Sequence, residues 1–314
     1  MKRDARIFVA GASGLLGRAL VRRLRAAGFS ELLLPAHRDL DLERAQEVQA
    51  FFRAERPEYV FLAAARVGGI VANQKSPADF ITSNLAIPTH VLRAAHESEA
   101  DGLCFFGSSC MYPRDGRQPI SEEDLGLGPL EETSRAYAIA KLAGVELCRA
   151  YRTQFGRRFF ALVPATLYGP HDHFASERAH VIPALITRIH DARRRGDPAV
   201  TVLGSGRARR EFLHCDDAAE AAIFLMSSGA ELDLLNIGSG EEVTIADLAH
   251  RIARVAGFTG SLRFDRRAPD GAERKLLDSR RARALGWRPR IALDSGLEQA
   301  YRWYASSVEG SPRS

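Results

Sequence analysis

Four residues that can move protons lie close together in the first half of the 314-residue chain. Ser108 and Cys110 follow the apolar run LCFF in the segment GSSCMYP, at the mouth of an expected strand. Tyr137 and Lys141 are spaced i, i+4 in YAIAK and so lie on one face of an expected helix. A nearby ammonium favours a phenolate over a phenol, whose ordinary pKa is about 10. We therefore expect Lys141 to lower the pKa of Tyr137, so that the pair can pass a proton to a carbonyl oxygen.

A glycine turn follows the first apolar run, ARIFVA, in the segment GASGLLG. Glycines allow a tight turn and a close approach of backbone to a diphosphate, and the N-terminus of the next helix offers unpaired N–H groups. Such a turn is weak evidence alone, but after the first strand of a β-α-β series it predicts a dinucleotide site. The expected cofactor contacts in this turn are Gly11, Ser13, Gly14, Leu15, Leu16 and Gly17.

The end of the second expected strand, ELLLPAHRD, distinguishes the two nicotinamide dinucleotides. An acidic residue there binds a ribose 2′-hydroxyl, whereas Arg38 can pair with a 2′-phosphate. We therefore expect NADP. The alternative is that Arg38 is solvated and that Asp39 or Asp41 binds the ribose, although Asp41 is better placed to cap the following helix.

Short apolar runs alternate with helical patterns throughout the first half of the chain. This order predicts an α/β protein with a Rossmann-type doubly wound parallel sheet. After about Pro170 the regularity breaks down, which indicates a smaller C-terminal substrate-binding lobe interleaved with the last sheet strands. We expect an NADP-binding domain over residues 1–170 to which later segments return, a mainly substrate-binding lobe over 171–308, and a disordered tail over 309–314.

Composition excludes several other classes of protein. The net charge is +5, but 39 acidic residues are mixed among 44 basic ones, so nucleic-acid binding is not expected. No apolar run approaches the ~18 residues of a membrane span, and no signal core is visible. The four cysteines are irregularly spaced and form no C-x-x-C pair, which favours a reducing, cytoplasmic location. His171 and His173 lack completing ligands nearby in the sequence, so we expect no metal site.

The motifs together resemble a known family over nearly the whole chain. The sequence is similar to the extended short-chain dehydrogenase/reductases and, within them, to the GDP-L-fucose synthase family. The segments that carry the resemblance are LAAARVGGIVAN, PADFI, GSSCMYP, YAIAKLAG, LYGPHD, HVIPALITRIH, REFLHCDD, NIGSG and PDGAERKLLD. Of these, RVGGIVAN, SSC and HVIPAL are much more specific than the general fold signature.

The resemblance implies an NADPH-dependent enzyme that epimerises C3 and C5 and reduces C4 of a GDP-linked 4-keto-6-deoxy sugar, most simply to GDP-L-fucose. It matches Ser108, Tyr137 and Lys141 to a reductase triad, and Cys110 and His180 to an epimerisation pair. The substrate-binding positions that it implies are Arg188, Leu203, Arg210 and Asp270. The further cofactor positions that it implies are Phe106, Gly107, Ser108, Lys141, Pro164, Leu167 and His180. It also implies a homodimer formed through the helices over 78–96 and 137–155.

The proposed epimerisation chemistry can be argued independently of the resemblance. A C4 ketone acidifies the hydrogens on C3 and C5, so inversion needs one group to remove a proton and another to return one. Thiols and imidazoles have ordinary pKa values of about 8.5 and 6.5, which suit this work. The alternative interpretation is that Cys110 is a small packed hydrophobe and that His180 is a hydrogen-bonded histidine at the edge of the core.

Two departures from the family pattern leave the exact sugar open. Thr166 stands where the family usually has asparagine, and Leu203 stands where it usually has tryptophan. A GDP-linked deoxyheptose or a colitose precursor is therefore an alternative substrate. A regulator that senses NADPH without turnover is a more distant alternative, against which the intact triad argues.

Overall fold

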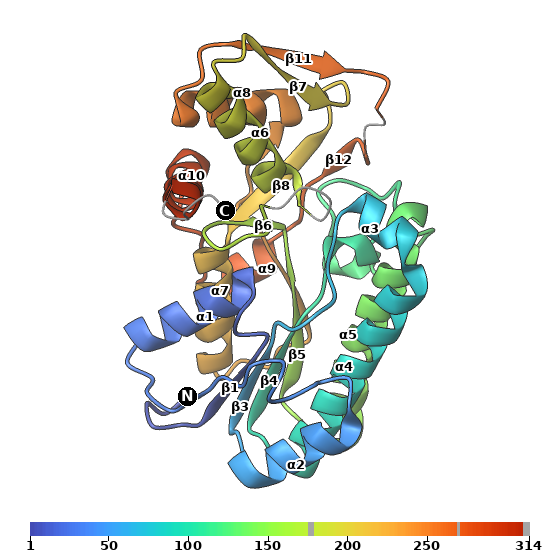
Figure 1. Ribbon diagram of the computed structural model, residues 1–314. Helices are drawn as coiled ribbons and strands as arrows, with labels where there is room; N and C mark the ends of the chain where they lie inside the picture. The colour runs from blue at the N-terminus through green and yellow to red at the C-terminus, as the bar shows by residue number, and fades with distance from the viewer. Residues whose placement is uncertain (175–178, 269–270, 310–314) are drawn as a thin grey trace.

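The computed structural model describes residues 1–174, 179–268 and 271–309. Its centre is a six-stranded sheet with the order β2-β1-β3-β4-β5-β9, in which all neighbouring strands are parallel (Figure 1). The strands are β1 (Ile7–Ala10), β2 (Leu32–Leu33), β3 (Tyr59–Leu62), β4 (Gly102–Phe106), β5 (Phe159–Pro164) and β9 (Leu234–Ile237). The α/β class with a parallel central sheet, predicted from the alternating pattern, is confirmed.

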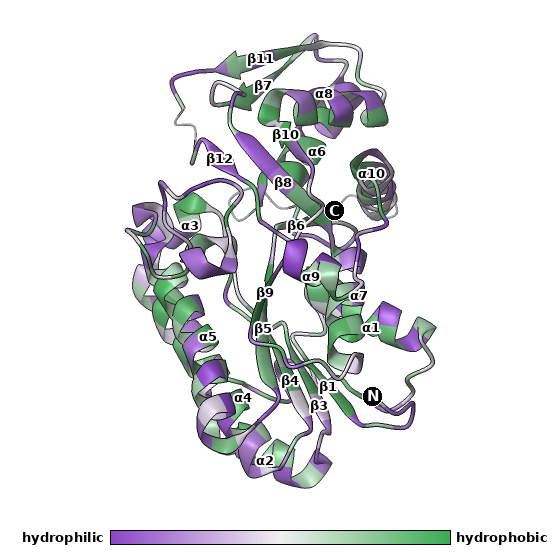
Figure 2. Ribbon diagram, turned by 180° about the vertical axis from the view of Figure 1, so that it is seen from behind, coloured by the Kyte–Doolittle hydropathy of each residue, from purple (hydrophilic) through white to green (hydrophobic). Residues whose placement is uncertain are grey.

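Helices cover both faces of this sheet, which explains why its strands are apolar throughout rather than alternating. Helices α1 (Leu15–Ala26) and α7 (Cys215–Ser227) pack together on one face. The other face is covered by α2 (Ala45–Glu55), α4 (Pro77–Glu97) and α5 (Arg135–Phe155), which lie side by side (Figure 1). Colouring by hydropathy shows mainly apolar central strands between helices that mix apolar and polar residues (Figure 2).

A second, smaller layer of structure lies beyond the carboxyl ends of the strands and has its own buried cluster. Its helices are α6 (Val181–Arg195), α8 (Ile245–Ala256) and α10 (Leu293–Glu309). Its strands are β6 (Thr166–Tyr168), β7 (Ala199–Leu203), β8 (Arg209–His214), β10 (Glu242–Thr244), β11 (Ser261–Asp265) and β12 (Arg274–Lys275). Strand β8 pairs with β6, β10 and β12, and β7 pairs with β11 in a separate parallel sheet.

The chain crosses between the two layers several times. After β8 it returns to the central sheet through α7 and β9, and it then enters the second layer again at β10. The short helix α9 (Arg280–Ala284) packs beside β9, and α3 (Ile70–Lys75) lies before α4. Residues 310–314 of the expected tail lie outside the described residues, while Glu309 is the last residue of α10. Across the described ranges, none of the helices combines the length and apolar character that crossing a membrane requires.

Candidate active site

A cavity of about 2200 Å³ is lined both by residues at the carboxyl ends of the central strands and by residues of the second layer. Open α/β sheets bind ligands at this edge. The volume exceeds the ~300–1,000 Å³ that is common for a single small ligand. The cavity therefore has room for a dinucleotide and a second ligand of nucleotide size.

The glycine turn forms one wall of this cavity, and its shape requires glycine. A Cβ on Gly11, whose φ is +83°, would lie 2.7 Å from the backbone nitrogen of Ala64, and a Cβ on Gly17 would lie 1.9 Å from the Gly11 carbonyl oxygen. Gly14 is the N-cap of α1 and provides no side-chain cap, so the first N–H groups of the helix remain available to an anion. This backbone cradle fits a dinucleotide diphosphate. All six predicted residues of the turn line the cavity, and they are Gly11, Ser13, Gly14, Leu15, Leu16 and Gly17.

The three predicted reductase residues meet at the same edge. Ser108 follows β4 and hydrogen-bonds through its side chain to Tyr137 on the first turns of α5. Lys141 is one turn further along α5, with its Nζ 5.9 Å from the centroid of the Tyr137 ring. Lys141 is buried and donates a hydrogen bond to the Phe106 carbonyl oxygen at 2.8 Å. The elements β4 and α5 thus bring Ser108, Tyr137 and Lys141 together.

The expected direction of the Tyr137 pKa shift is wrong. Burial raises the pKa of Tyr137, the neighbouring Cys110 raises it further, and the hydrogen bond with Ser108 only partly offsets them. Burial also lowers the pKa of Lys141 to about 7, so this side chain carries only a partial charge near neutrality. The Lys141 ammonium donates its hydrogen bond to the Phe106 carbonyl oxygen and not to the Tyr137 hydroxyl. Tyr137 is therefore held as a neutral phenol, ready to donate its proton.

Cys110 differs from the other three cysteines in both position and chemistry. It lies in the short 3-10 turn Ser109–Met111 and is only partly buried, whereas Cys104, Cys148 and Cys215 are buried. Burial raises the pKa of the Cys110 thiol, but the charge of Lys275 and hydrogen bonds with Ser108 and Ser134 outweigh it, so the net pKa is lowered. For the three buried cysteines burial raises the pKa. Among the cysteines, Cys110 alone combines an accessible position with an acidified thiol.

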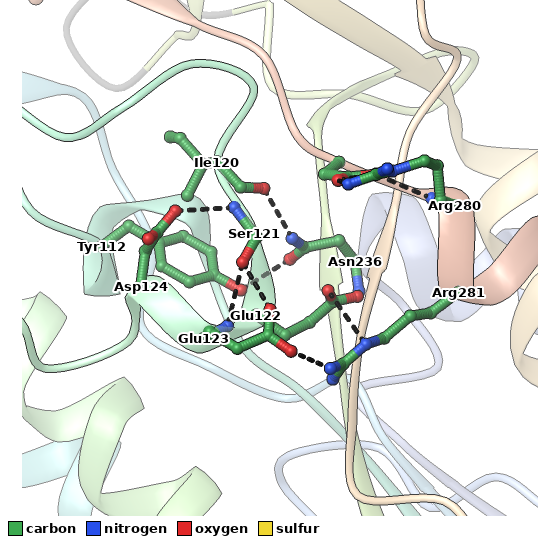
Figure 3. A network of polar contacts seen from close by, with 10 residues as sticks. Tyr112, Ile120, Ser121, Glu122, Glu123, Asp124, Asn236, Arg280 and Arg281 are labelled. Carbon is green, nitrogen blue, oxygen red and sulfur yellow. Dashed lines mark hydrogen bonds and ion pairs between the residues drawn. The ribbon is translucent and has the colours of Figure 1, made fainter.

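A buried network holds the turn that carries Cys110 (Figure 3). Tyr112 is 2% exposed and donates its hydroxyl hydrogen to Oδ1 of Asn236 at 2.6 Å. Asn236, on β9, donates from its side-chain amide to the Ile120 carbonyl oxygen at 3.0 Å, and its backbone N–H donates to Oε1 of Glu122 at 2.8 Å. Arg281 on α9 pairs with Glu122 at 3.8 Å. The network fixes the turn against the end of the central sheet, so Ser108 and Cys110 rest on a rigid support.

Glu211 provides a comparable anchor in the second layer. This carboxylate on β8 is 1% exposed and accepts the backbone N–H of Gly240 at 2.6 Å and that of Leu277 at 2.9 Å. It therefore holds the segment after β12 against β8. Strand β12 pairs with β8, and in this pairing Lys275 lies opposite Arg210. Both cationic residues line the cavity.

Most of the remaining predicted residues also line the cavity. Phe106, Gly107, Pro164 and Leu167 lie along its sheet side, and Thr166 lies beside them. The residues from the second layer that line it are His180, Arg188, Leu203 and Arg210. His180 is the N-cap of α6 and has an exposed side chain, and Leu203 is 54% exposed. Asp270 lies outside the described residues.

Arg38 does not line the cavity in this structure. Its side chain is 88% exposed and approaches Asp39 at 3.6 Å. The expectation that Asp41 caps the next helix is wrong, because α2 begins only at Ala45, after Arg44 as N-cap. Asp41 instead accepts the backbone N–H of Glu43 at 3.0 Å in a turn and lines the cavity.

Sequence reasoning missed two charged residues of the cavity wall. Lys275 lies within the segment PDGAERKLLD, and its charge acts on the Cys110 thiol. Asp172 lies in the segment LYGPHD, and it is a buried carboxylate that lines the cavity. Neither has a local sequence signal, because the burial of Asp172 and the approach of Lys275 to Cys110 both result from the tertiary fold.

The two histidines considered for a metal, His171 and His173, have different surroundings. His171 packs against the Trp303 ring, with centroids 4.7 Å apart, and His173 lines the cavity. A different group, His214, Cys215 and Asp216, has its ligand atoms within 4.8 Å of one another. Asp216 is already paired with Arg22, and its backbone N–H donates to Nδ1 of His214 at 3.2 Å at the start of α7. A guanidinium and a helix N-terminus favour an anion over a cation at this place.

The fold and the site together define a Rossmann-type nucleotide-dependent enzyme with the Ser-Tyr-Lys arrangement of a dehydrogenase. The model of the NAD dependent epimerase/dehydratase family matches residues 7–238. The chain belongs to this family, which confirms the resemblance found in its motifs.

Relatives and solved structures narrow the comparison further. The chain is 49% identical to GDP-L-fucose synthase 1 of Arabidopsis thaliana over 98% of its own length and 95% of that protein. A GDP-L-fucose synthetase from Naegleria fowleri bound to NADP superposes with a TM-score of 0.91 at 27% identity, covering 100% of this chain and 96% of the other. A GDP-mannoheptose C4 reductase from Campylobacter jejuni with NADP bound has a TM-score of 0.90 at 35% identity, with coverages of 97% and 99%. Both of these structures contain NADP, in agreement with the predicted cofactor.

Proposed function

We propose that this chain is an NADPH-dependent enzyme that epimerises C3 and C5 and reduces C4 of a GDP-linked 4-keto-6-deoxy-hexose, giving GDP-L-fucose. The observation that carries the proposal is that the Ser108 hydroxyl lies between a phenol and a thiol, two different acid-base groups. Ser108 hydrogen-bonds both to Tyr137 and to the acidified thiol of Cys110. A reductase alone needs Ser108, Tyr137 and Lys141, whereas the thiol adds proton transfer at carbon. The similarity to a plant GDP-L-fucose synthase supports the same activity.

The described residues fit NADPH at the sheet side of the cavity. The Gly11–Gly17 turn and the first N–H groups of α1 would hold its diphosphate, and Arg38 would pair with its 2′-phosphate. When bound, NADPH would supply the hydride that reduces C4. The GDP moiety would be bound from the other side of the cavity by Arg188 and Arg210, because guanidinium groups match diphosphate oxygens.

Epimerisation would come first and would depend on Cys110 and His180. The ketone at C4 stabilises the carbanion formed when a proton leaves C3 or C5. Cys110 would remove or return a proton as thiolate or thiol, with the charge of Lys275 supporting the thiolate. His180 would serve as the second acid-base group, and a small shift of the sugar would allow one pair to act at both carbons.

Reduction would then use the residues on β4 and α5. Tyr137 would donate its phenolic proton to the C4 oxygen as the hydride arrives at carbon, and the raised pKa keeps this proton in place near neutrality. Ser108 would hydrogen-bond the same oxygen. Lys141 would support the phenolate left behind, since its Nζ lies on the same side of the helix.

Turnover in heavy water tests this assignment. Wild-type enzyme should place solvent deuterium at C3 and C5 of the product and leave C4 unlabelled. Cys110→Ser should lower the exchange rate by about 10²–10⁴-fold, the usual effect of losing a general base, and should still oxidise NADPH slowly. Tyr137→Phe should show the opposite pattern, with exchange retained and NADPH oxidation nearly lost. A wild-type product without deuterium would show that the enzyme is a plain C4 reductase.

A C4 reductase acting on another GDP-linked sugar, such as a heptose, is the second candidate. Thr166 and Leu203 favour it, because both line the cavity and both differ from the usual residues of the GDP-L-fucose synthase family. A panel of GDP-linked 4-keto hexoses and heptoses, followed by NADPH oxidation, separates the two. A preference of at least tenfold in kcat/KM for a heptose would replace the first assignment.

A further inference from the structure

Asp172 is a buried carboxylate in the wall of the cavity that the proposed mechanism has not used. Its side chain is only 9% exposed. One oxygen, Oδ1, accepts the backbone N–H of His173 at 2.7 Å. The other, Oδ2, is fully buried and has no hydrogen-bond partner among the described residues.

The surroundings of Asp172 point to His180 as the missing partner. Both residues line the same cavity. Burial raises the pKa of the Asp172 carboxyl, and among the charged neighbours that oppose this effect the His180 ring acts more strongly than that of the adjacent His173. The buried thiol of Cys215 also senses the Asp172 charge, but a thiol is only a weak hydrogen-bond donor.

A buried carboxylate oxygen without a donor is costly, since it has lost water without gaining a hydrogen bond. An imidazole N–H is a suitable donor for it. The backbone of His180 is held as the N-cap of α6 with φ −71° and ψ 171°, while its side chain is exposed in the cavity. The exposed imidazole can therefore rotate about its side-chain bonds while the backbone of the helix stays in place.

We propose that Asp172 is the positioning residue for His180, accepting a hydrogen bond from one ring nitrogen so that the other is aimed at the sugar. The carboxylate would fix one neutral tautomer and stabilise the imidazolium that forms when His180 takes a proton, as the buried aspartate does in Ser-His-Asp enzymes. This role rests on the proposed function of His180 in epimerisation. It also accounts for a buried, half-satisfied carboxylate at the edge of a cavity.

A spectroscopic test on the nucleotide-free protein is independent of turnover. The ring nitrogens of the nine histidines can be observed by ¹⁵N NMR, and the signals missing from His180→Gln identify those of His180. Wild type should show one neutral tautomer for this ring. Asp172→Asn should show a mixture of both, because an amide can donate as well as accept. Asp191→Asn, which removes a carboxylate from α6 away from the cavity, should leave the tautomer unchanged.

Kinetics supply the second test. Asp172→Asn should slow deuterium exchange at C3 and C5 by about tenfold or more, since an unoriented imidazole is a poorer acid-base group. NADPH oxidation with a substrate already epimerised should change less than twofold. An averaged tautomer for His180 in wild type would overturn the proposal, and this result does not depend on whether Asp172→Asn folds. Equal losses in exchange and reduction in Asp172→Asn would overturn it as well. Absence of exchange in wild type would instead refute the proposed epimerase function. The tautomer measurement alone would then decide whether Asp172 positions the His180 ring.

Discussion

Replacing Lys141 by methionine should stabilise the nucleotide-free protein while it abolishes reduction of the sugar. Lys141 is 4% exposed, and burial lowers its pKa from an ordinary 10.5 to about 7. A buried ammonium has lost its hydration and gained one hydrogen bond, to Phe106. Methionine has a similar length and can occupy the same space without a charge.

The magnitude follows from the pKa difference between folded and unfolded protein. Each pH unit corresponds to 1.36 kcal/mol, so a folded-state pKa near 7 against 10.5 when unfolded costs about 5 kcal/mol once both states are protonated, below pH 7. Between pH 7 and 10.5 only the unfolded state binds the proton, so the cost shrinks as the pH rises. Losing the donor to the Phe106 carbonyl costs about 1–3 kcal/mol. Lys141→Met should therefore be more stable than wild type by about 2–4 kcal/mol at pH 6.

Urea unfolding at pH 6 and pH 9, without nucleotide, measures this difference. The stability advantage of Lys141→Met should be about 2–3 kcal/mol smaller at pH 9 than at pH 6. The reason is that pH 9 lies about two units above the folded-state pKa of Lys141, and the cost of burying Lys141 falls with each of these units. Lys2→Met removes an exposed ammonium and should show no such pH dependence. A variant that is less stable than wild type at pH 6, or an advantage that is equal at both pH values, would show that Lys141 is not destabilised by burial.

Three further outcomes are expected. Arg38→Ala should weaken NADPH binding by about 1.5–3 kcal/mol and NADH binding much less, as titrations with both cofactors would show, and equal losses would exclude the 2′-phosphate contact. Lys275→Met should raise the pKa of the Cys110 thiol and so slow its alkylation by iodoacetamide at pH 7, whereas Arg274→Met, which removes a guanidinium paired with Glu242, should not. The chain should form a homodimer through α4 and α5, and a monomer mass in light scattering at micromolar concentration would contradict this.

The elements of the nucleotide half could be predicted because their signals are local. An apolar run followed by GASGLLG specifies a strand, a tight turn and a helix within about twenty residues, and the resulting Gly11 conformation tolerates no side chain. The i, i+4 spacing of Tyr137 and Lys141 likewise determines that both lie on one side of α5. The position of Ser108 and Cys110 just after β4 follows from the same local reasoning.

The electrostatic character of the site depended on tertiary contacts that no local pattern contains. Tyr137 and Lys141 were expected to act on each other, yet burial dominates both pKa values, and burial is a property of the assembled layers. Lys275 lies 165 positions beyond Cys110 in the sequence and reaches it only because β12 pairs with β8 at the cavity wall. The sequence alone thus determined which reactive groups are present and which elements carry them. The tertiary fold determined how far these groups are desolvated and which charges lie near one another, because desolvation and Coulomb interactions depend on distances in space.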